Sequence, residues 1–313
     1  MLVLGEVRTC LLHNTAPLPT PLVAQILGTV PGRRVLCTER PIAHAVSPEL
    51  VTGIDCTLAT SSRVRARGIG TVTSRAMITS GLVLQGSASA YLRRATGPSR
   101  LAWSHYADQL GVVEVISRAD AAELAEGYLA DSTPSSTIDL GSVSERLISD
   151  IQGHVQLDHV TSVRARPTWV RWAARVGDHD GPVARVRSDG DVVHAIELIV
   201  DESQLGLAAR FCEDFALHDW LLTTLGQVIE QTDRLKALGQ QAIDILTTAV
   251  ERLFHVWMPG AQVDPALSPL WDALEQRPGF SRQWNTQVAR IRDQIALQTL
   301  QAVEQTRRGN ADW

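Results

Sequence analysis

The strongest pattern of hydrophobic and polar positions in the chain runs from Asp201 to Gln231. Its apolar residues and one histidine recur at alternating steps of three and four, which places them on one stripe of an α-helix. The stripe consists of Ala208, Phe211, Phe215, His218, Leu222, Leu225 and Ile229. Asp201 and Gln204 have the spacing of a capping box, and Val200 and Leu205 that of a hydrophobic staple. The pattern predicts a helix over residues 202–231 whose stripe packs against a partner.

The same three-four spacing continues through the rest of the C-terminal third. It predicts three further helices, over residues 234–257, 269–277 and 282–307. Ser268 and Pro269 give a helix start, while Pro278 and Gly279 give a helix end. Antiparallel packing of these helices as a bundle would bury all the stripes.

Residues 168–200 alternate between apolar and polar positions, which is typical of strands with one buried face. Val170, Trp172, Ala174 and Val176 share one such face. A three-residue turn at 188–190 would pair Val186 with Val192, Ala184 with His194 and Pro182 with Ile196. A two-residue turn at 189–190 would instead place Arg185 and Arg187 among apolar neighbours. We therefore expect a three-stranded antiparallel meander, with His194 on its buried face, leading into the helix at Asp201.

The first 130 residues read as a β-rich region with short helices. The pattern predicts strands at 2–12 and 35–38, antiparallel β structure over 43–91, and helices from Thr20, at 103–110 and at 119–129. Ser117 and Asp120 are the expected cap of the last of these. The polar stretch 131–137 resembles a linker. We expect an α+β protein with a β-rich N-terminal domain (1–130) and a second domain (138–313) that opens with a helix at 140–151 and then holds the meander and the helical bundle.

Composition sets the class of protein. A chain of 313 residues exceeds what one core usually fills, and 44% hydrophobic with 20% charged residues is ordinary for a globular protein. The net charge is −5, with the acidic excess in the C-terminal part, so nucleic acid is not the expected partner. No run is long and apolar enough for a membrane helix, and the N-terminus lacks the features of a targeting peptide. Four scattered cysteines indicate reduced thiols and a cytoplasmic location.

Motifs for catalysis or cofactor binding are weak. The sequence has no GKS or GKT, no GxSxG and no HExxH. Gly68 and Gly70 are better explained by a strand bulge than by a nucleotide loop, and the DHD at 178–180 by a turn. Asp214 and His218 have a metal-ligand spacing on a helix, yet His218 lies in the apolar stripe. We expect no catalytic residue, no metal and no cofactor.

The best candidate for a binding surface is the outward face of the predicted meander. This face gathers aromatic and arginine side chains of the kind that bind phosphates or acidic surfaces: Trp169, Arg171, Arg175, Arg185 and Arg187. Asp191 and Glu197 fall on the same face. They favour the alternative of a solvated sheet with cross-strand ion pairs. If the face binds a partner, an acidic protein fits the net charge better than DNA does.

Five runs of the sequence resemble a conserved actinobacterial protein family: GEVRTCLL, ERPIAHAVSPELVTGIDC, CEDFALHDWLLTTL, WMPG and PLWDALEQRPGFSRQW. The resemblance implies a gene encoded beside a variant P-loop protein and a methyltransferase-like protein, hence a role in a multi-component system. It brings no catalytic residues.

Three hypotheses follow. The first is a non-enzymatic assembly or adaptor subunit with protein partners, for which the eight tryptophans are candidate interface anchors. Self-association into a homo-oligomer is compatible with it. The second is an enzyme or nucleotide-binding protein whose site is scattered in sequence, with His44 and His105 as pointers. The third is a nucleic-acid-binding module that uses the arginine and tryptophan face.

Overall fold

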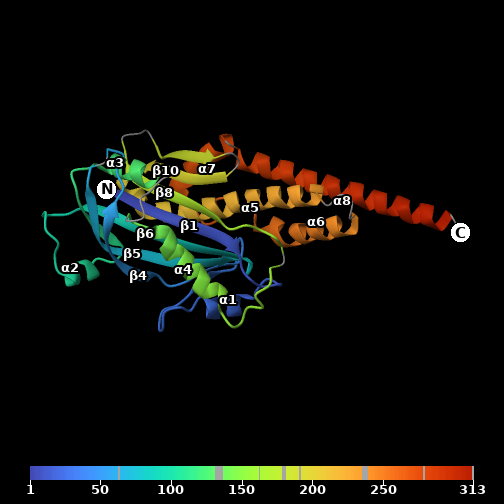
Figure 1. The fold of residues 1–313 in the computed structure, drawn as a ribbon, viewed down its shortest axis with the longest axis horizontal. Coiled ribbons are helices and arrows are strands. Elements are labelled where there is room, and N and C mark those ends of the chain that lie inside the picture. Colours follow the sequence, from blue (N-terminus) through green and yellow to red (C-terminus); the bar gives the residue numbers. More distant parts are fainter. Residues whose placement is uncertain are drawn as a thin grey trace.

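The structure is a computed structural model that describes residues 1–62, 64–130, 137–161, 163–177, 181–189, 192–234, 239–277 and 279–311. Within these ranges the chain forms one mixed ten-stranded sheet and eight α-helices (Figure 1). The predicted α+β class is therefore confirmed. Residues 131–136 of the predicted linker at 131–137 lie outside the described residues. So do the predicted turn at 178–180, Gly190 of the predicted turn at 188–190, and Asp191 of the predicted meander face.

The N-terminal strands lie largely within the predicted β stretches, except β7, which the sequence did not predict. They are β1 (Leu2–Leu11), β2 (Leu36–Thr38), β3 (His44–Val46), β4 (Leu50–Leu58), β5 (Ala66–Thr79), β6 (Val83–Arg94), β7 (Val112–Ile116), β8 (Thr168–Val176), β9 (Val183–Asp189) and β10 (Val192–Val200). Their order in the sheet is β2-β3-β5-β7-β6-β1-β8-β10-β9, with β4 also paired to β5. Pairing between β1 and β8 joins the N-terminal strands to the C-terminal ones over eight positions, from Leu2↔Arg175 to Thr9↔Thr168.

The Gly68 to Gly70 segment is part of β5, where the sheet divides. One half of β5 pairs with β6, while residues 67–70 pair with β7, which also pairs with the end of β6. Strand β7 thus fills the wedge between two diverging strands. Gly70 has a φ of 155°, and a Cβ there would overlap the Val112 carbonyl oxygen. Only glycine permits this close approach of two backbones.

Two strand predictions for residues 168–200 are wrong. Strand β10 pairs with β8 in parallel, from Ala195↔Arg171 to Val200↔Val176, and lies between β8 and β9. These strands therefore form no antiparallel meander. The burial pattern supplies the physical reason: Ile196, Leu198 and Val200 are fully buried, so β10 takes the interior position. Strand β9 carries exposed Arg185 and Arg187 and takes the edge, where charged residues discourage further pairing.

The predicted register between β9 and β10 is also wrong. Asp189 pairs with Val192, a β-bulge follows between Val193 and Ala195, and beyond it Val186 pairs with Ile196 and Ala184 with Leu198. The bulge moves His194 out of the predicted pairing with Ala184. Nevertheless Val186 and Ala184 still pair with apolar residues, because a shift by an even number of residues keeps each side chain on its face.

Four helices lie in the first half of the chain: α1 (Thr20–Ile26), α2 (Trp103–Ala107), α3 (Ala121–Tyr128) and α4 (Leu140–Gln152). The predicted cap of α3 is wrong by three residues. Asp120 accepts from the Glu123 backbone N–H, and Glu123 accepts from the Asp120 backbone N–H, which completes a capping box. Ser117 precedes this helix and bonds the Ala119 backbone N–H instead.

The C-terminal helices confirm most of the predicted pattern. They are a 3₁₀ turn at Glu202–Leu207, α5 (Ala208–Arg234), α6 (Gly239–Leu253), α7 (Ser268–Gln276) and α8 (Phe280–Ala311). The Asp201 backbone N–H donates to the Gln204 side chain, as the predicted capping box requires, although the first turn is 3₁₀ rather than α. None of the described helices has the length and apolar composition that a bilayer crossing requires.

The helices cover both faces of the sheet. Helix α5 packs on one face, against β1, β8 and β10, while α3 and α4 pack on the other (Figure 1). All seven residues of the predicted α5 stripe are buried. Helix α5 is in fact buried on every side from Phe211 to Leu222, because α6 and α8, together with Trp271 of α7, cover the side away from the sheet. Most described tryptophans are core residues too, including Trp172 and Trp220, which are fully buried.

Helix α8 differs from the others in reaching far beyond the sheet. It spans 32 residues, or about 48 Å at 1.5 Å per residue. Its first half packs on α5 and α6 through Trp284, Val288, Ile291 and Ile295. Its second half projects past the ends of α5 and α6 (Figure 1).

Candidate functional site

The predicted arginine and tryptophan face lies on the side of the sheet that α3 and α4 cover. Trp169, Arg171 and Arg175 come from β8, and Arg185 and Arg187 from β9. Helix α3 restricts access to this face, because the Arg171 guanidinium lies 5.9 Å from the ring centre of buried Tyr128. The structure therefore places the five residues on one face, but this face is not fully open.

Carboxylates neutralise most of these arginines. Arg171 Nε lies 3.3 Å from Glu6 Oε2, and Arg8 Nε lies 3.1 Å from Glu6 Oε1. Arg175 and Arg185 share Glu197, at 2.8 Å and 3.4 Å. Burial raises the pKa of Glu6, and the two arginines oppose that rise. The arrangement matches the alternative of a sheet with cross-strand ion pairs, and partner binding by these five residues stays a prediction.

His194 lies on this same face rather than on the buried face predicted for it. Its ring is 5.1 Å from that of Trp169, and the interplanar angle is 36°. The bulge between Val193 and Ala195 accounts for the change of face.

Asp214 and His218 hold a loop in place. His218 Nδ1 donates to the Asp214 carbonyl oxygen at 2.6 Å, and His218 Nε2 accepts from the Met258 backbone N–H at 3.1 Å. Asp214 Oδ2 accepts from the Gly260 backbone N–H at 2.7 Å. Burial lowers the pKa of His218, so the imidazole is neutral and uses both nitrogens. The pair thus fixes the WMPG segment against α5. Among the described residues, no three histidine, cysteine, aspartate or glutamate side chains are placed to share a metal ion.

His44 and His105 have separate sets of partners. His105 Nε2 lies 3.0 Å from Glu114 Oε1, which also accepts from Arg93. His44 Nδ1 lies 3.0 Å from Thr79 Oγ1, at the far end of β5. The two histidines predicted as pointers to a scattered site therefore do not share partners.

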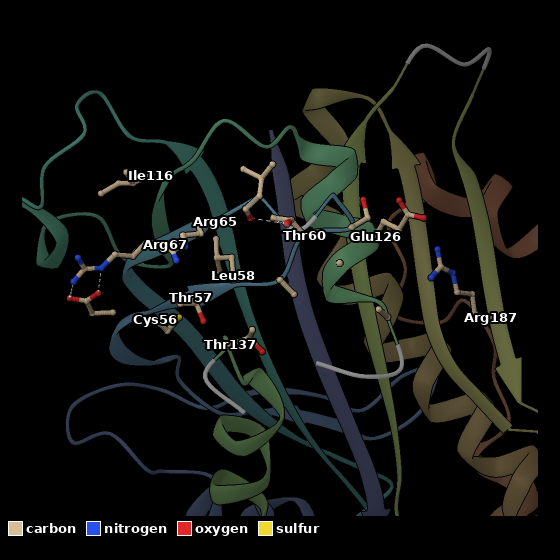
Figure 2. Close-up of a pocket in the computed structure, with 17 residues that line it drawn as sticks. Cys56, Thr57, Leu58, Thr60, Arg65, Arg67, Ile116, Glu126, Thr137 and Arg187 are labelled. Atoms are coloured by element: carbon tan, nitrogen blue, oxygen red, sulfur yellow. Dashed lines mark hydrogen bonds and ion pairs between the residues drawn. The ribbon is translucent and has the colours of Figure 1, made fainter. Parts of the chain in front are cut away.

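A broad hollow of about 1360 Å3 opens where β4, β5 and α3 meet, with Arg187 of β9 among its lining residues (Figure 2). Two of its charged groups satisfy each other, because Arg67 makes a two-bond pair with Asp55 at 2.8 Å. Burial raises the pKa of the Cys56 thiol to about 11, so this cysteine is not a reactive thiolate. The hollow is therefore large, but Cys56 does not give it a reactive nucleophile.

A cleft of about 800 Å3 lies between β2 to β5 and the first half of α5. Under most of α5 the sheet face is apolar, but here it is polar. Thr9, Thr79, Gln85 and Ser87 are all buried. Gln85 Nε2 donates to Thr9 Oγ1 at 3.1 Å and to the Glu213 carbonyl oxygen at 2.9 Å. Buried polar groups on a sheet face are unusual and mark this region as a candidate site.

Charged side chains from both walls of this cleft meet at its floor. Arg75 of β5 makes two hydrogen bonds with Glu213 of α5, at 2.9 Å and 2.7 Å. Glu213 raises the pKa of Arg75 further. His44 lines the same cleft, and burial, aided by Arg75 and Arg210, lowers its pKa to about 4. His44 is therefore neutral near pH 7.

The sequence interpretation missed Arg75, Arg210 and Glu213. A signal was present, since Arg75 interrupts the otherwise uncharged run TVTSRAMIT and Glu213 adjoins the buried stripe of α5. A charged residue within a buried element needs a partner. The sequence could not show that Arg75 and Glu213, which are 138 residues apart, pair with each other.

The fold and these sites thus define an α+β protein with a mixed sheet, a polar cleft and a projecting helix. Comparison with protein-family models, with curated proteins and with solved structures found no match.

Proposed function

We propose that the protein is a non-enzymatic assembly subunit, and that it docks a helix of a partner protein on the projecting half of α8. The observation that carries this proposal is an apolar surface without a partner within the described chain. Leu297, Leu300 and Val303 are 60%, 62% and 46% exposed. Monomeric proteins seldom leave large aliphatic side chains clustered on a free helix.

The position of these residues on the helix supports docking rather than incomplete packing. The inward stripe of α8 ends at Ile295, which packs on the core. At about 100° per residue, Leu300 lies about 180° around the helix from Ile291, and Leu297 and Val303 lie about 120° from it on either side. The apolar surface therefore changes sides where α8 leaves the body of the molecule.

The composition of this segment indicates what covers it. Residues 294–303, QIALQTLQAV, contain no charged side chain. A helix that lies on a lipid headgroup surface or on nucleic acid carries basic residues beside its contact face. The projecting half has only Arg307 and Arg308, both beyond the stripe, so these occupants fit less well. An amphipathic helix with its own apolar stripe does fit. The resemblance described above points to the products of the neighbouring genes, the variant P-loop protein and the methyltransferase-like protein, as its source. The free cysteines are compatible with the cytoplasmic location that we also propose.

Co-expression with these two neighbours tests the proposal. Leu297→Glu with Leu300→Glu places two charges in the stripe and should abolish co-purification of the partner. Asn285→Glu with Ala289→Glu is the matched control, since both residues are exposed on α8 near the body of the molecule. This control should retain the partner.

Three results would contradict the proposal: neither neighbour co-purifies with the unmodified chain, the stripe variant retains its partner, or the stripe variant loses its folded circular dichroism. A second copy of the chain is the other possible occupant of the α8 stripe, and light scattering of the isolated protein tests for it. If the protein is a dimer that only the stripe variant dissociates, α8 is a self-association helix and not a docking site for another protein.

A further inference from the structure

The cleft between β2 to β5 and α5, defined above by its floor of Arg75 and Glu213, has an excess of positive charge. Arg33, Arg34 and Arg210 line its mouth, and none of the three makes an ion pair within the described chain. The charges of Arg75 and Glu213 cancel at the floor. Glu49 is the lining carboxylate without a short contact. Its side chain is 58% exposed and lies 3.8 Å from Arg75.

The third acid in the lining, Asp214, is only 4% exposed and so does not present its carboxylate at the mouth. Its carboxylate accepts from the Gly260 backbone N–H, and burial raises its pKa. The mouth therefore presents three guanidinium groups against one exposed carboxylate. Guanidinium groups bind phosphate oxygens in pairs of parallel hydrogen bonds, and a cluster of them favours a ligand with at least two negative charges.

The remaining lining suits the organic part of such a ligand. Leu36, Val46, Leu110 and Leu217 provide apolar wall, and the volume of about 800 Å3 falls in the range of small-molecule pockets. His44 Nδ1 is occupied by Thr79, while no described group bonds its Nε2. The neutral imidazole can therefore supply a hydrogen bond that adds no charge. A second hollow of about 200 Å3 shares Arg75, Arg210 and Glu213 and widens the site toward Ser87 and Tyr91.

We propose that this cleft binds a small organic phosphate with two or more negative charges, held by Arg33, Arg34 and Arg210 at the mouth, with its organic part against the apolar wall. The ligand is bound and not transformed. This site lies on the sheet body and is separate from the projecting half of α8, so it is independent of the proposed assembly role.

Isothermal titration calorimetry of the full chain tests this, with ATP and pyrophosphate as probes and citrate as a carboxylate of comparable charge. ATP should bind more tightly than pyrophosphate, because only ATP has an organic part to contact the wall. Arg34→Glu with Arg210→Glu should weaken ATP binding at least tenfold, while Glu49→Gln should strengthen it about threefold through the loss of one opposing charge.

Arg118→Glu with Arg146→Glu is the matched control, because it makes the same change of charge at two exposed arginines outside the cleft. It should leave binding within twofold. Equal weakening by the control would mean that only net charge matters, and this would overturn the site. Absence of ATP binding, or citrate binding as tightly as ATP, would overturn the phosphate assignment.

The stripe variant Leu297→Glu with Leu300→Glu separates this inference from the assembly proposal. It should bind ATP like the unmodified chain, and the Arg34 and Arg210 variant should keep its protein partner. A loss of ATP binding in the stripe variant would contradict the independence of the two sites.

Discussion

Asp219 is a buried acid whose burial is only partly compensated by hydrogen bonds in the described structure. Its side chain lies within α5, is 4% exposed, and its Oδ2 atom has no hydrogen-bond partner there. Burial alone raises the pKa of Asp219 to about 7. Asp214, one turn away, is also buried but accepts from the Gly260 backbone N–H. The two carboxylates on one helix thus differ in whether a loop supplies them with a donor.

The raised pKa of Asp219 predicts a pH-dependent stability. In the unfolded chain this carboxyl ionises near its ordinary pKa of 3.8, whereas in the folded chain it stays protonated up to about pH 7. The folded state therefore binds more protons between these values, and unfolding free energy is lost as pH rises through this window. Asp219→Asn removes the effect. The quantity to measure is the unfolding free energy of this variant in urea minus that of the unmodified chain. This difference should be roughly 3 kcal/mol larger at pH 8 than at pH 5.

Asp272→Asn, at an exposed position on α7, is the control for this experiment. Its difference from the unmodified chain should be the same at both pH values. If Asp219→Asn behaved like this control, the carboxylate would have a solvent contact that its burial does not indicate.

Among the elements, those with a local pattern were predictable from the sequence. The α5 stripe, the α8 stripe up to Ile295 and the antiparallel strands of residues 43–91 depend on residue spacing that a short window contains. Strand β7 gave no comparable signal, because it has five residues and takes its place through the divergence of β5 and β6. The order β8-β10-β9 was missed because adjacency in sequence favours a meander. The order of these strands follows their burial instead: the more buried β10 lies inside the sheet, and β9 lies at its edge.

The pairing of β1 with β8 depends on a glycine that faces a tryptophan. A Cβ at Gly5 would overlap the indole of Trp172, which is fully buried. Gly5→Ala should therefore lower the unfolding free energy by about 1 to 3 kcal/mol, the usual cost of overpacking a core. Tryptophan fluorescence during denaturant unfolding measures this loss.

Gly97→Ala is the matched control, because a Cβ there would meet no atom within 4 Å. It should stay within about 0.5 kcal/mol of the unmodified chain. Equal effects of the two substitutions would show that the indole can move aside, and that the β1–β8 contact is less tightly packed than the structure indicates.

At the scale of the whole molecule, the projecting half of α8 is separable from the rest. Beyond Ala296, Leu297, Thr299, Leu300, Gln301 and Val303 are exposed. A chain that ends at Ala296 should therefore keep its melting temperature within about 3 °C, since it loses little buried surface. A chain that ends at Gly279 loses buried Phe280, Trp284 and Ile291 and should not fold stably. Thermal denaturation followed by circular dichroism distinguishes these outcomes.

A large drop in melting temperature on ending the chain at Ala296 would mean that the last turns of α8 stabilise the body of the protein. That result would also remove the main support for a docking role. The length of α8 was predicted from its stripe only to residue 307, and the change of side at residue 297 was not predicted. The spacing of apolar residues predicts a helix, but which of its side chains are exposed depends on where the neighbouring helices end.

The central position of β1 affects how the chain folds during synthesis. Strand β1 leaves the ribosome first and finds β6 within the first hundred residues, but its other neighbour, β8, is translated some 75 residues after β6. Until then the edge of β1 that pairs with β8, which is eight residues long, is open to any other strand, including that of a second nascent chain. Slow translation between residues 95 and 168, or the absence of a chaperone over that interval, should therefore lower the yield of native protein.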